Sequence, residues 1–300
     1  MSGVGGMLGE AFYKQFKTDY ILKCTDIDVN EDWLTYLDFR DEGAYRKEVT
    51  DFNPDYLFHI GALIDLEYCD LHETEAYESN TKPVEYAVKI ANDLKIPLLY
   101  VSTAGIFRGE KDVYDETDKP EPLGHYGRSK YFGEVCVQEN SNKYIICRAG
   151  WMMGAGEKKD KKFIQKMIKQ ISDGKKILKV VNDKLGTPTY TQDFAKNVKL
   201  LVEKDQTGLF NMVCGGLTGR YEVCKELVRL MGLEEIVNIE EVSSDYFATE
   251  YFSKRPPSER LINKRLDELG LNIMQDWDVA LKEYLSDYYP ELAVKLIQTY

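Results

Sequence analysis

The chain has 300 residues, of which 43% are hydrophobic, and a formal net charge of −12 at neutral pH. This length and apolar fraction suffice for one large domain, or for two domains in close contact, with a proper core. The negative charge argues against nucleic acid as a main partner, because proteins that bind it are usually basic. An anionic ligand would instead need local donors, such as backbone N–H groups or single Arg and Lys side chains.

The six cysteines indicate a reducing compartment. None belongs to a Cys-x-x-Cys pair, and several lie in apolar runs such as 144–147 and 210–214. We therefore expect reduced core cysteines in a cytoplasmic protein. A metal site is not expected, because only three histidines are present and none is close to a cysteine pair. No apolar run reaches the roughly 18 residues of a membrane span, and no signal peptide is recognisable.

The first 150 residues alternate short apolar strands with helices. Leu8, Phe12 and Phe16 form a helical stripe that predicts a helix over 7–17. The next expected elements are strands at 20–26 and 33–38, a helix at 44–52, a strand at 56–62, a helix at 72–94, a strand at 97–102, a helix at 126–139 and a strand at 143–148. This alternation predicts a parallel sheet with helices on both faces, that is, a Rossmann-type doubly wound α/β fold.

The pattern changes after residue 150. The charged run 157–162 predicts a solvated surface loop. The remainder mixes short strands with helices, which are expected at 163–172, 191–204, 220–231 and 277–287. We therefore expect a dinucleotide-binding domain at 1–150 with return segments near 180–214, and a smaller substrate-binding region at 151–180 and 215–300.

A glycine-rich turn, Gly3-x-x-Gly6-x-x-Gly9, leads directly into the first helix. Glycines permit a tight turn and let a pyrophosphate approach the helix N-terminus, where free N–H groups and the helix dipole favour anions. Asp26 follows 17 residues after Gly9, at the end of the next strand, where a carboxylate can accept hydrogen bonds from the adenosine ribose. Asp28 is a nearby competitor for that role. Asp38 follows the next strand and is either an adenine contact or a turn residue.

A dinucleotide turn normally follows a strand, yet only Met1 and Ser2 precede this one. The sequence thus predicts that the central first strand is missing. Removal of a central parallel strand would strip hydrogen bonds from its neighbours and open the core. We therefore expect that the start was assigned to an internal methionine, rather than that the fold lacks this strand.

A Tyr-x-x-x-Lys pair, Tyr126 and Lys130, lies downstream of Thr103, which ends an expected strand. In a helix the two side chains share one face. An ammonium beside a phenol favours the phenolate and lowers its pKa from about 10. Tyr126 could then exchange a proton with a carbonyl or alcohol oxygen that Thr103 holds in place. The same spacing occurs twice more in the chain, so context singles out this copy.

These residues resemble the extended short-chain dehydrogenase/reductase family. The motifs that follow the glycine turn in the family's order and rough spacing are Ile60-Gly61-Ala62, Asn80, Ser102-Thr103, Tyr126/Lys130 and Arg148. Within the family the chain resembles the dTDP-4-dehydrorhamnose reductases, through the segments 101–107, 148–151, 185–189 and 255–261. The resemblance covers almost the whole chain, and the last segment is its most specific part.

The resemblance implies NAD(P)H-dependent reduction of the 4-keto group of a nucleoside-diphosphate-6-deoxysugar, as in dTDP-rhamnose biosynthesis. By position, Tyr126 would donate the proton, Lys130 would hold the nicotinamide ribose, and Thr103 would polarise the carbonyl. Trp151 would line the sugar pocket and Arg255 would reach the nucleotide or its phosphates; core packing and a surface ion pair are their respective alternatives.

The resemblance and the glycine turn also imply a set of cofactor contacts. In addition to Tyr126 and Lys130, these are Gly3, Gly6, Met7, Leu8, Gly9, Asp26, Asp38, Phe39, Ile60, Gly61, Ala62, Asn80 and Ser102. Asp26 would repel a 2′-phosphate, and the turn itself carries no Arg or Lys to attract one. We therefore expect NADH to be slightly favoured over NADPH.

Two departures leave other functions open. The reductases usually carry Asp-Tyr directly after the catalytic threonine, where this chain has Ala104-Gly105. Small residues there are also typical of sugar-nucleotide epimerases and dehydratases with tightly held NAD. The regulatory β subunit of methionine adenosyltransferase shares much of this fold, so a non-catalytic cofactor-binding subunit is a third hypothesis. A homodimer is one expectation for the assembly, and neither nucleic acid nor a membrane is expected as a partner.

Overall fold

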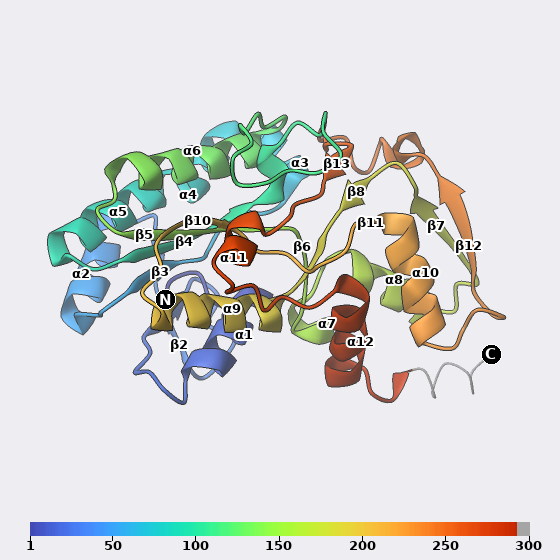
Figure 1. The fold of residues 1–300 in the computed structure, drawn as a ribbon, viewed down its shortest axis with the longest axis horizontal. Coiled ribbons are helices and arrows are strands. Elements are labelled where there is room, and N and C mark those ends of the chain that lie inside the picture. The colour runs from blue at the N-terminus through green and yellow to red at the C-terminus, as the bar shows by residue number, and fades with distance from the viewer. Residues whose placement is uncertain (293–300) are drawn as a thin grey trace.

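The computed structural model describes residues 1–292. Figure 1 shows an elongated molecule with a sheet and its flanking helices at one end. At the other end, α8, α10 and α12 gather beside short strands, and the segments that contain β6, β8 and β11 run between the two ends.

A parallel sheet forms the centre of the first part. Its four strands lie in the order β10-β5-β4-β3, with bounds Gly208–Asn211, Tyr144–Ala149, Leu98–Thr103 and Leu57–His59. A further parallel pair consists of β1 (Cys24–Asp26) and β2 (Leu34–Tyr36). The parallel pairing throughout confirms the predicted α/β fold class.

The first residues of the chain occupy the position between β1 and β3. Ser2 bridges Thr25 on one side and His59 on the other, in parallel with both. Its carbonyl accepts a hydrogen bond from the Ile60 N–H at 3.0 Å. The prediction that the first strand is missing was therefore wrong in part, because residues 1–3 supply the end of that strand and join β1 and β2 to the main sheet.

Helices cover both faces of the sheet. On one face, α1 (Met7–Phe16) packs against α9 (Thr191–Glu203) over the apolar side chains of β4 and β5. On the other face lie α2, α5 and α6, with bounds Glu42–Phe52, Lys82–Leu94 and His125–Asn140. Because side chains alternate between faces, Leu99 and Val101 of β4 meet the first layer and Leu98 and Tyr100 meet the second. Burial on both faces explains the continuous apolar runs in the sequence.

The second part has its own core. The helices α8 (Phe163–Ser172), α10 (Arg220–Leu230) and α12 (Trp277–Tyr288) pack with the parallel pair β7 (Ile177–Val181) and β12 (Asn238–Val242). Two small sheets complete the fold. One pairs β6 (Trp151–Met153) with β9 (Pro188–Tyr190), and the other has the order β11-β8-β13, with bounds Thr218–Gly219, Leu185–Gly186 and Ser258–Glu259. On these two cores we propose the domain division predicted above.

The helix expected at 72–94 is interrupted. It consists of α4 (Glu73–Asn80) and α5, and Pro83 lies in the first turn of α5. Proline has no N–H to donate, so it is tolerated at a helix start but ends a preceding helix. The remaining short helices were not predicted: α3 (Leu66–Leu71), α11 (Lys264–Glu268) and the single turns η1 (Ala104–Ile106) and η2 (Ser244–Phe247).

The prediction of a solvated loop at 157–162 was wrong in part: Glu157, Lys158 and Lys161 are exposed, whereas Asp160 is buried. The segment begins in a short helix, α7 (Gly156–Lys159). Asp160 is fully buried and accepts a hydrogen bond from the Tyr284 hydroxyl at 3.0 Å. The Lys159 ammonium is 3.0 Å from the Glu31 carboxylate and is also largely buried. Contacts with Tyr284 and Glu31, which are distant in sequence, thus bury part of this charged run.

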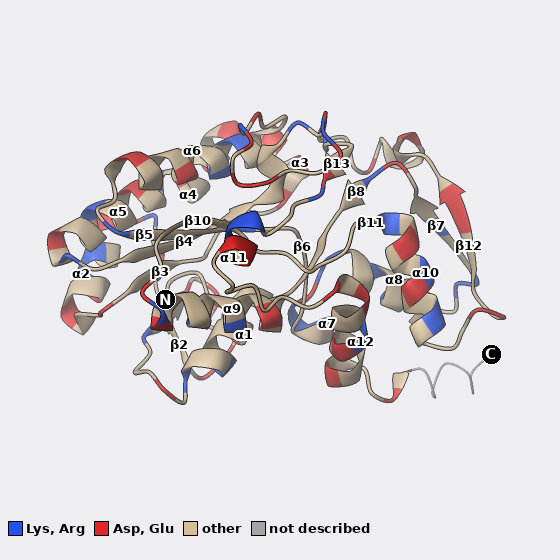
Figure 2. Ribbon diagram, in the orientation of Figure 1, with Lys and Arg blue, Asp and Glu red and all other residues tan. Residues whose placement is uncertain are grey.

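Charged residues are distributed over both parts of the molecule, and the cysteines form no disulfides in the described part of the chain. Figure 2 shows acidic and basic positions interspersed along the helices of both parts. All six cysteines, which lie in the described part of the chain, are unpaired, and five of them are buried. Within residues 1–292, no helix combines the length and apolarity needed to cross a membrane.

A buried ion pair joins α6 to β5. The side chains of Glu134 and Arg148 are 0% and 2% exposed, and the arginine Nε donates to the glutamate Oε2 at 3.1 Å. The guanidinium also lies over the Phe107 ring, 5.2 Å from its centre. Since neither charge is solvated, each depends on the other for its stability.

We expect Glu134→Ala to lower the free energy of unfolding by about 3–5 kcal/mol, because the arginine charge would remain buried without a partner. Asp93→Ala is the matched control, since it removes one partner of the exposed pair with Arg46 and should cost about 0–1 kcal/mol. Urea denaturation followed by circular dichroism measures both. Equal losses in the two variants would contradict the importance of burial.

Candidate active site

Thr103, Tyr126 and Lys130 meet at the carboxyl end of the main sheet. Thr103 is the last residue of β4, and the other two lie one turn apart at the start of α6. The Thr103 side chain lies close enough to the Tyr126 hydroxyl to lower the pKa of that hydroxyl. Lys130 is buried, with its ammonium 4.3 Å from the centre of the Tyr100 ring. The fold thus brings Thr103 and Tyr126 close together and places Lys130 one turn further along α6; the catalytic roles of the three remain a prediction.

Burial controls the protonation of both titratable side chains. It raises the pKa of Tyr126 to about 12, although the Thr103 side chain acts in the opposite direction. It lowers the pKa of Lys130 to about 7, and the Glu134 carboxylate opposes this change. The expected lowering of the tyrosine pKa was therefore wrong, because desolvation of the phenolate dominates. Tyr126 is protonated at neutral pH, which suits a proton donor.

The glycine turn is built for close contacts at two positions and is open at a third. Gly3 has a φ of +73°, and a Cβ there would overlap the backbone of Gly61. A Cβ on Gly9 would overlap the carbonyl of Val4. Gly6, the N-cap of α1, would place a Cβ in open space, with nothing within 4 Å. The backbone before the first N–H groups of α1 is therefore uncovered, as the predicted binding of a pyrophosphate there would require.

Asp26, the predicted ribose contact, and Asp38, the predicted adenine contact, have different hydrogen-bond partners. Asp26 lies at the end of β1, and its carboxylate accepts hydrogen bonds from the N–H groups of Gly5 at 2.8 Å and Asp28 at 2.9 Å. It therefore lies beside the glycine turn. Asp38 instead binds the Arg40 guanidinium through both oxygens, at 2.9 and 2.7 Å, and these hydrogen bonds lower its pKa. Contact of Asp38 with adenine remains a prediction.

Asn80 connects the loop after β3 to α6. Its amide oxygen accepts from the Leu63 N–H at 2.7 Å, and its amide nitrogen donates to the Leu63 carbonyl at 2.9 Å and to the Ser129 hydroxyl at 3.0 Å. The side chain is 1% exposed. Asn80 thus positions the walls of the candidate cofactor site, and its direct contact with a cofactor remains a prediction.

The other predicted cofactor residues lie at this edge of the sheet or in the first turn of α1: Met7, Leu8, Phe39, Ile60, Gly61, Ala62 and Ser102. The Phe39 ring packs so closely on Gly61 that a Cβ there would lie 2.9 Å from its Cζ. Among residues 1–292, no group of three or more His, Cys, Asp or Glu side chains is arranged to hold a metal ion.

Trp151 belongs to a cluster that the sequence did not reveal. Its indole N–H donates to Glu259 Oε2 at 2.9 Å, and the Arg220 guanidinium lies over its ring, 3.8 Å from the centre. Gly186 leaves room for this ring, because a Cβ there would overlap it. The sheet β11-β8-β13 brings these residues together: Glu259 is opposite Gly186, and Arg220 directly follows β11.

The cluster places positive charge near Trp151. Burial lowers the pKa of Arg220 to about 10, while the Glu259 carboxylate acts against this change. The same guanidinium lies over Phe163, 4.7 Å from the ring centre. Lys162 directly precedes Phe163 in the chain and is near enough to Arg220 for the two charges to repel. The pKa of Lys162 is also lowered, mainly by burial.

Arg255 lies close enough to this cluster for its charge to act on Arg220, but it is bound by another partner. Its guanidinium forms a two-point ion pair with Glu67 of α3, at 2.6 and 2.9 Å. The two side chains are 28% and 21% exposed. The ion-pair alternative for Arg255 therefore describes its position in the structure, and its contact with a nucleotide remains a prediction.

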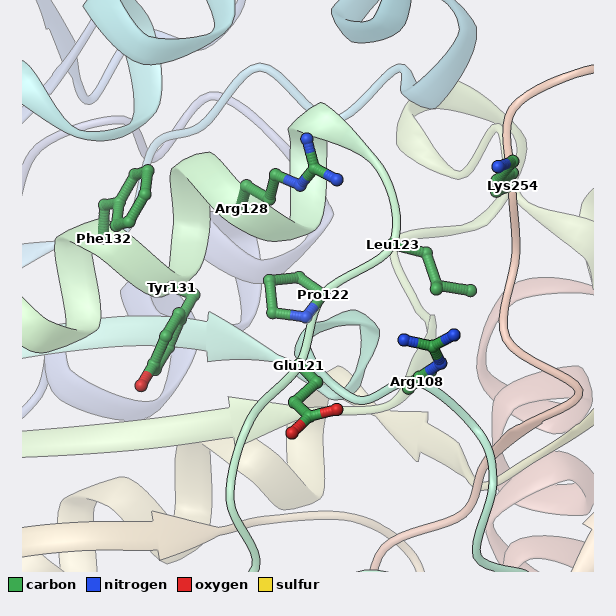
Figure 3. Close-up of a pocket in the computed structure, with 8 residues that line it drawn as sticks. All are labelled: Arg108, Glu121, Pro122, Leu123, Arg128, Tyr131, Phe132 and Lys254. Atoms are coloured by element: carbon green, nitrogen blue, oxygen red, sulfur yellow. The ribbon is translucent and has the colours of Figure 1, made fainter.

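A cavity of about 490 Å³ lies elsewhere, on the outer side of α6. Figure 3 shows Arg128, Tyr131 and Phe132 on α6, beside the segment that carries Glu121 and Pro122. The lining residues are Arg108, Glu121, Pro122, Leu123, Arg128, Tyr131, Phe132 and Lys254. The predicted catalytic residues are not among them, so this cavity is separate from the candidate active site.

The fold and this geometry define a Rossmann-type α/β protein with a threonine, a tyrosine and a lysine at the carboxyl edge of its sheet. The family model described as RmlD substrate binding domain matches residues 1–289, and the chain belongs to this family. This match confirms the resemblance to the dTDP-4-dehydrorhamnose reductases noted from the motifs.

Known relatives match the chain over most of its length. The spore coat polysaccharide biosynthesis protein SpsK of Bacillus subtilis is 26% identical over 288 residues, covering 96% of each chain. The dTDP-4-dehydrorhamnose reductase of Escherichia coli is 26% identical, covering 86% of this chain and 87% of its own. The crystal structure of a dTDP-4-dehydrorhamnose reductase from Clostridium acetobutylicum is 28% identical, with a TM-score of 0.86 over 99% of this chain and 98% of its own.

We expect Gly6→Ala to preserve the fold and to weaken dinucleotide binding roughly tenfold or more, by about 1.4 kcal/mol. The added methyl would fit without a clash but would occupy the open space before α1. Gly43→Ala, in the first turn of α2, is the matched control. Fluorescence titration with NADH and NADPH measures the affinity, and thermal melting checks the fold. Unchanged affinity in the Gly6 variant would place the pyrophosphate elsewhere.

Proposed function

We propose that this protein is an NAD(P)H-dependent reductase that converts the 4-keto group of a nucleoside-diphosphate-6-deoxysugar to an alcohol. The observation that carries the proposal is the meeting of Thr103, Tyr126 and Lys130 beside the glycine turn, at one edge of the sheet. Membership of the RmlD family supports it. The names of these relatives make dTDP-4-dehydrorhamnose the first substrate to test.

In this proposal a bound nicotinamide would supply the hydride that reduces the carbonyl carbon. The turn and the N-terminus of α1 hold the pyrophosphate, and Asp26 accepts hydrogen bonds from the adenosine ribose. Thr103 orients the carbonyl oxygen. Tyr126, with its pKa near 12, gives its proton to that oxygen as negative charge develops there. Lys130 binds the nicotinamide ribose.

The nucleoside diphosphate needs concentrated positive charge in an acidic chain. Arg220 meets this need, because its guanidinium is desolvated and lies against the Trp151 ring that is predicted to line the sugar pocket. Arg255 would first have to leave Glu67. We therefore place Arg220 at the diphosphate and retain Arg255 as the second candidate.

A modest preference for NADH is part of the proposal. Asp26 stands where a 2′-phosphate would be repelled, beside a turn without Arg or Lys. Arg40, the nearby cation that could attract this phosphate, is already bound by Asp38. Tighter binding of NADPH than of NADH in a titration would overturn this preference.

The deciding experiment is a panel of nucleoside-diphosphate-4-keto-6-deoxysugars with NADH and with NADPH, followed through the nicotinamide absorbance. Oxidation of the reduced cofactor with at least one sugar is the expected result. The small residues Ala104-Gly105 are also typical of epimerases and dehydratases. Such an enzyme would change the sugar without net oxidation of the nicotinamide cofactor. A binding subunit would turn over none of the panel.

We expect Tyr126→Phe to lower kcat by about 10²–10⁴-fold, because the general acid is lost. Dinucleotide affinity should stay close to that of the wild type. Tyr131→Phe, on the outer side of the same helix, is the matched control and should retain activity. Stopped-flow measurement of the first turnover ensures that chemistry is observed, and a fully active Tyr126 variant would remove the tyrosine from the mechanism.

We expect Arg220→Ala to raise KM for the sugar nucleotide by roughly tenfold or more, as for loss of a charge-assisted hydrogen bond of about 1.5–3 kcal/mol. Arg220→Lys should recover only part of this loss, since an ammonium lacks the two-point fork. Arg255→Ala provides the comparison and should raise KM less. Steady-state kinetics with saturating cofactor measures all three, and the reverse order would assign the phosphates to Arg255.

A further inference from the structure

Glu259 places a carboxylate beside the proposed reacting centre, and the mechanism above does not use it. The residue lies in β13, where its backbone pairs with Gly186 of β8. Trp151 fixes one carboxylate oxygen, Oε2, through its indole N–H at 2.9 Å. The side chain is partly exposed rather than buried, and its charge is close enough to influence Tyr126 and Arg220.

The other oxygen borders a space that Gly105 leaves empty. A Cβ built on Gly105 would lie 3.4 Å from Glu259 Oε1 and 3.5 Å from Thr103 Oγ1. These two oxygens thus flank a single point. Both distances are ordinary van der Waals contacts, so a methyl group fits there. Because this point is only one bond from the Gly105 Cα, a ligand atom would lie beyond it. A side chain at position 105 would stand beside both oxygens, and glycine places none there.

A carboxylate at such a point selects for hydrogen-bond donors, because it can only accept. Hydroxyl, amide and ammonium groups are the donors that sugars offer, and the 6-deoxysugar of the proposed function carries hydroxyls. The nearby guanidinium of Arg220 disfavours a second cation, so a hydroxyl is the better match. A carbonyl and a hydroxyl on adjacent ring carbons leave the ring side by side, which suits a site flanked by Thr103 and Glu259.

We propose that Glu259, which no side chain at position 105 covers, forms a subsite for the hydroxyl on the sugar carbon adjacent to the keto carbon, which is C3 of a 4-keto sugar. This inference rests on the proposed reductase function. It assigns Glu259 to substrate selection: the carboxylate accepts a hydrogen bond from the 3-hydroxyl and rejects sugars that lack it. A site built to bind a hydroxyl discriminates strongly against the analogue without one, because its polar group is left unpaired.

The test compares a dTDP-4-keto-6-deoxysugar that carries the 3-hydroxyl with its 3-deoxy counterpart. The wild type should favour the hydroxylated sugar in kcat/KM by about 10-fold to 100-fold. Glu259→Ala should bring this ratio close to one. Glu259→Gln keeps an acceptor for Trp151 without the charge and should give an intermediate ratio. Gly105→Ala should mainly impair the hydroxylated sugar, and Glu240→Ala, at an exposed position of β12, should change nothing.

The ratio separates selection from a structural effect, since a loosened site would slow both sugars equally. An unchanged ratio in Glu259→Ala overturns the subsite. If the wild type reduces neither sugar, the proposed function fails, and calorimetry with the corresponding 4-hydroxy sugar nucleotides then decides on the subsite alone. Tighter wild-type binding of the 3-hydroxyl form that disappears in Glu259→Ala supports it. Equal binding of the two forms, or no binding, overturns it.

Discussion

The buried ion pair between Glu134 and Arg148 is the constraint on which the candidate active site depends. It attaches α6, which carries Tyr126 and Lys130, to β5, the strand next to the one that ends at Thr103. Helix and strand cannot separate without exposing an unpaired charge to apolar surroundings. The same carboxylate opposes the loss of charge on Lys130. One interaction therefore affects both where the lysine lies and how it is protonated.

Most of the first part of the fold was predictable because its signals are local. The Leu8/Phe12/Phe16 stripe identifies a helix by its periodicity, and the apolar runs around β3, β4 and β5 identify strands by their short length. Strand–helix alternation then implies a parallel sheet. Tyr126 and Lys130 were found for the same reason, since a helical spacing is visible in the sequence. Where the local signal was ambiguous, the structure differs, as at the helix break before Pro83 and in the charged run whose Asp160 is buried by Tyr284.

The rest of the candidate site depends on tertiary contacts, which cannot be read from the spacing of residues in the sequence. Arg220, Trp151 and Glu259 become neighbours only through a sheet of two-residue strands, which are too short to leave a pattern. Glu259 does lie within the 255–261 segment that supports the family resemblance, so its position there was the one available signal. Arg255 illustrates the opposite case: its sequence context favoured a ligand contact, and the fold supplied Glu67 as a partner instead. Desolvation, likewise invisible in the sequence, reversed the expected direction of the Tyr126 pKa.

The ammonium of Lys130 has a consequence for the heat of binding. With a pKa near 7, the group is only partly protonated in neutral solution, whereas a ligand oxygen that accepts its hydrogen bond stabilises the charged form. Such a ligand must draw a fraction of a proton from the solvent as it binds, by thermodynamic linkage. Apparent binding enthalpies would then vary with the ionisation heat of the buffer, and affinity would decline as the solution becomes more alkaline.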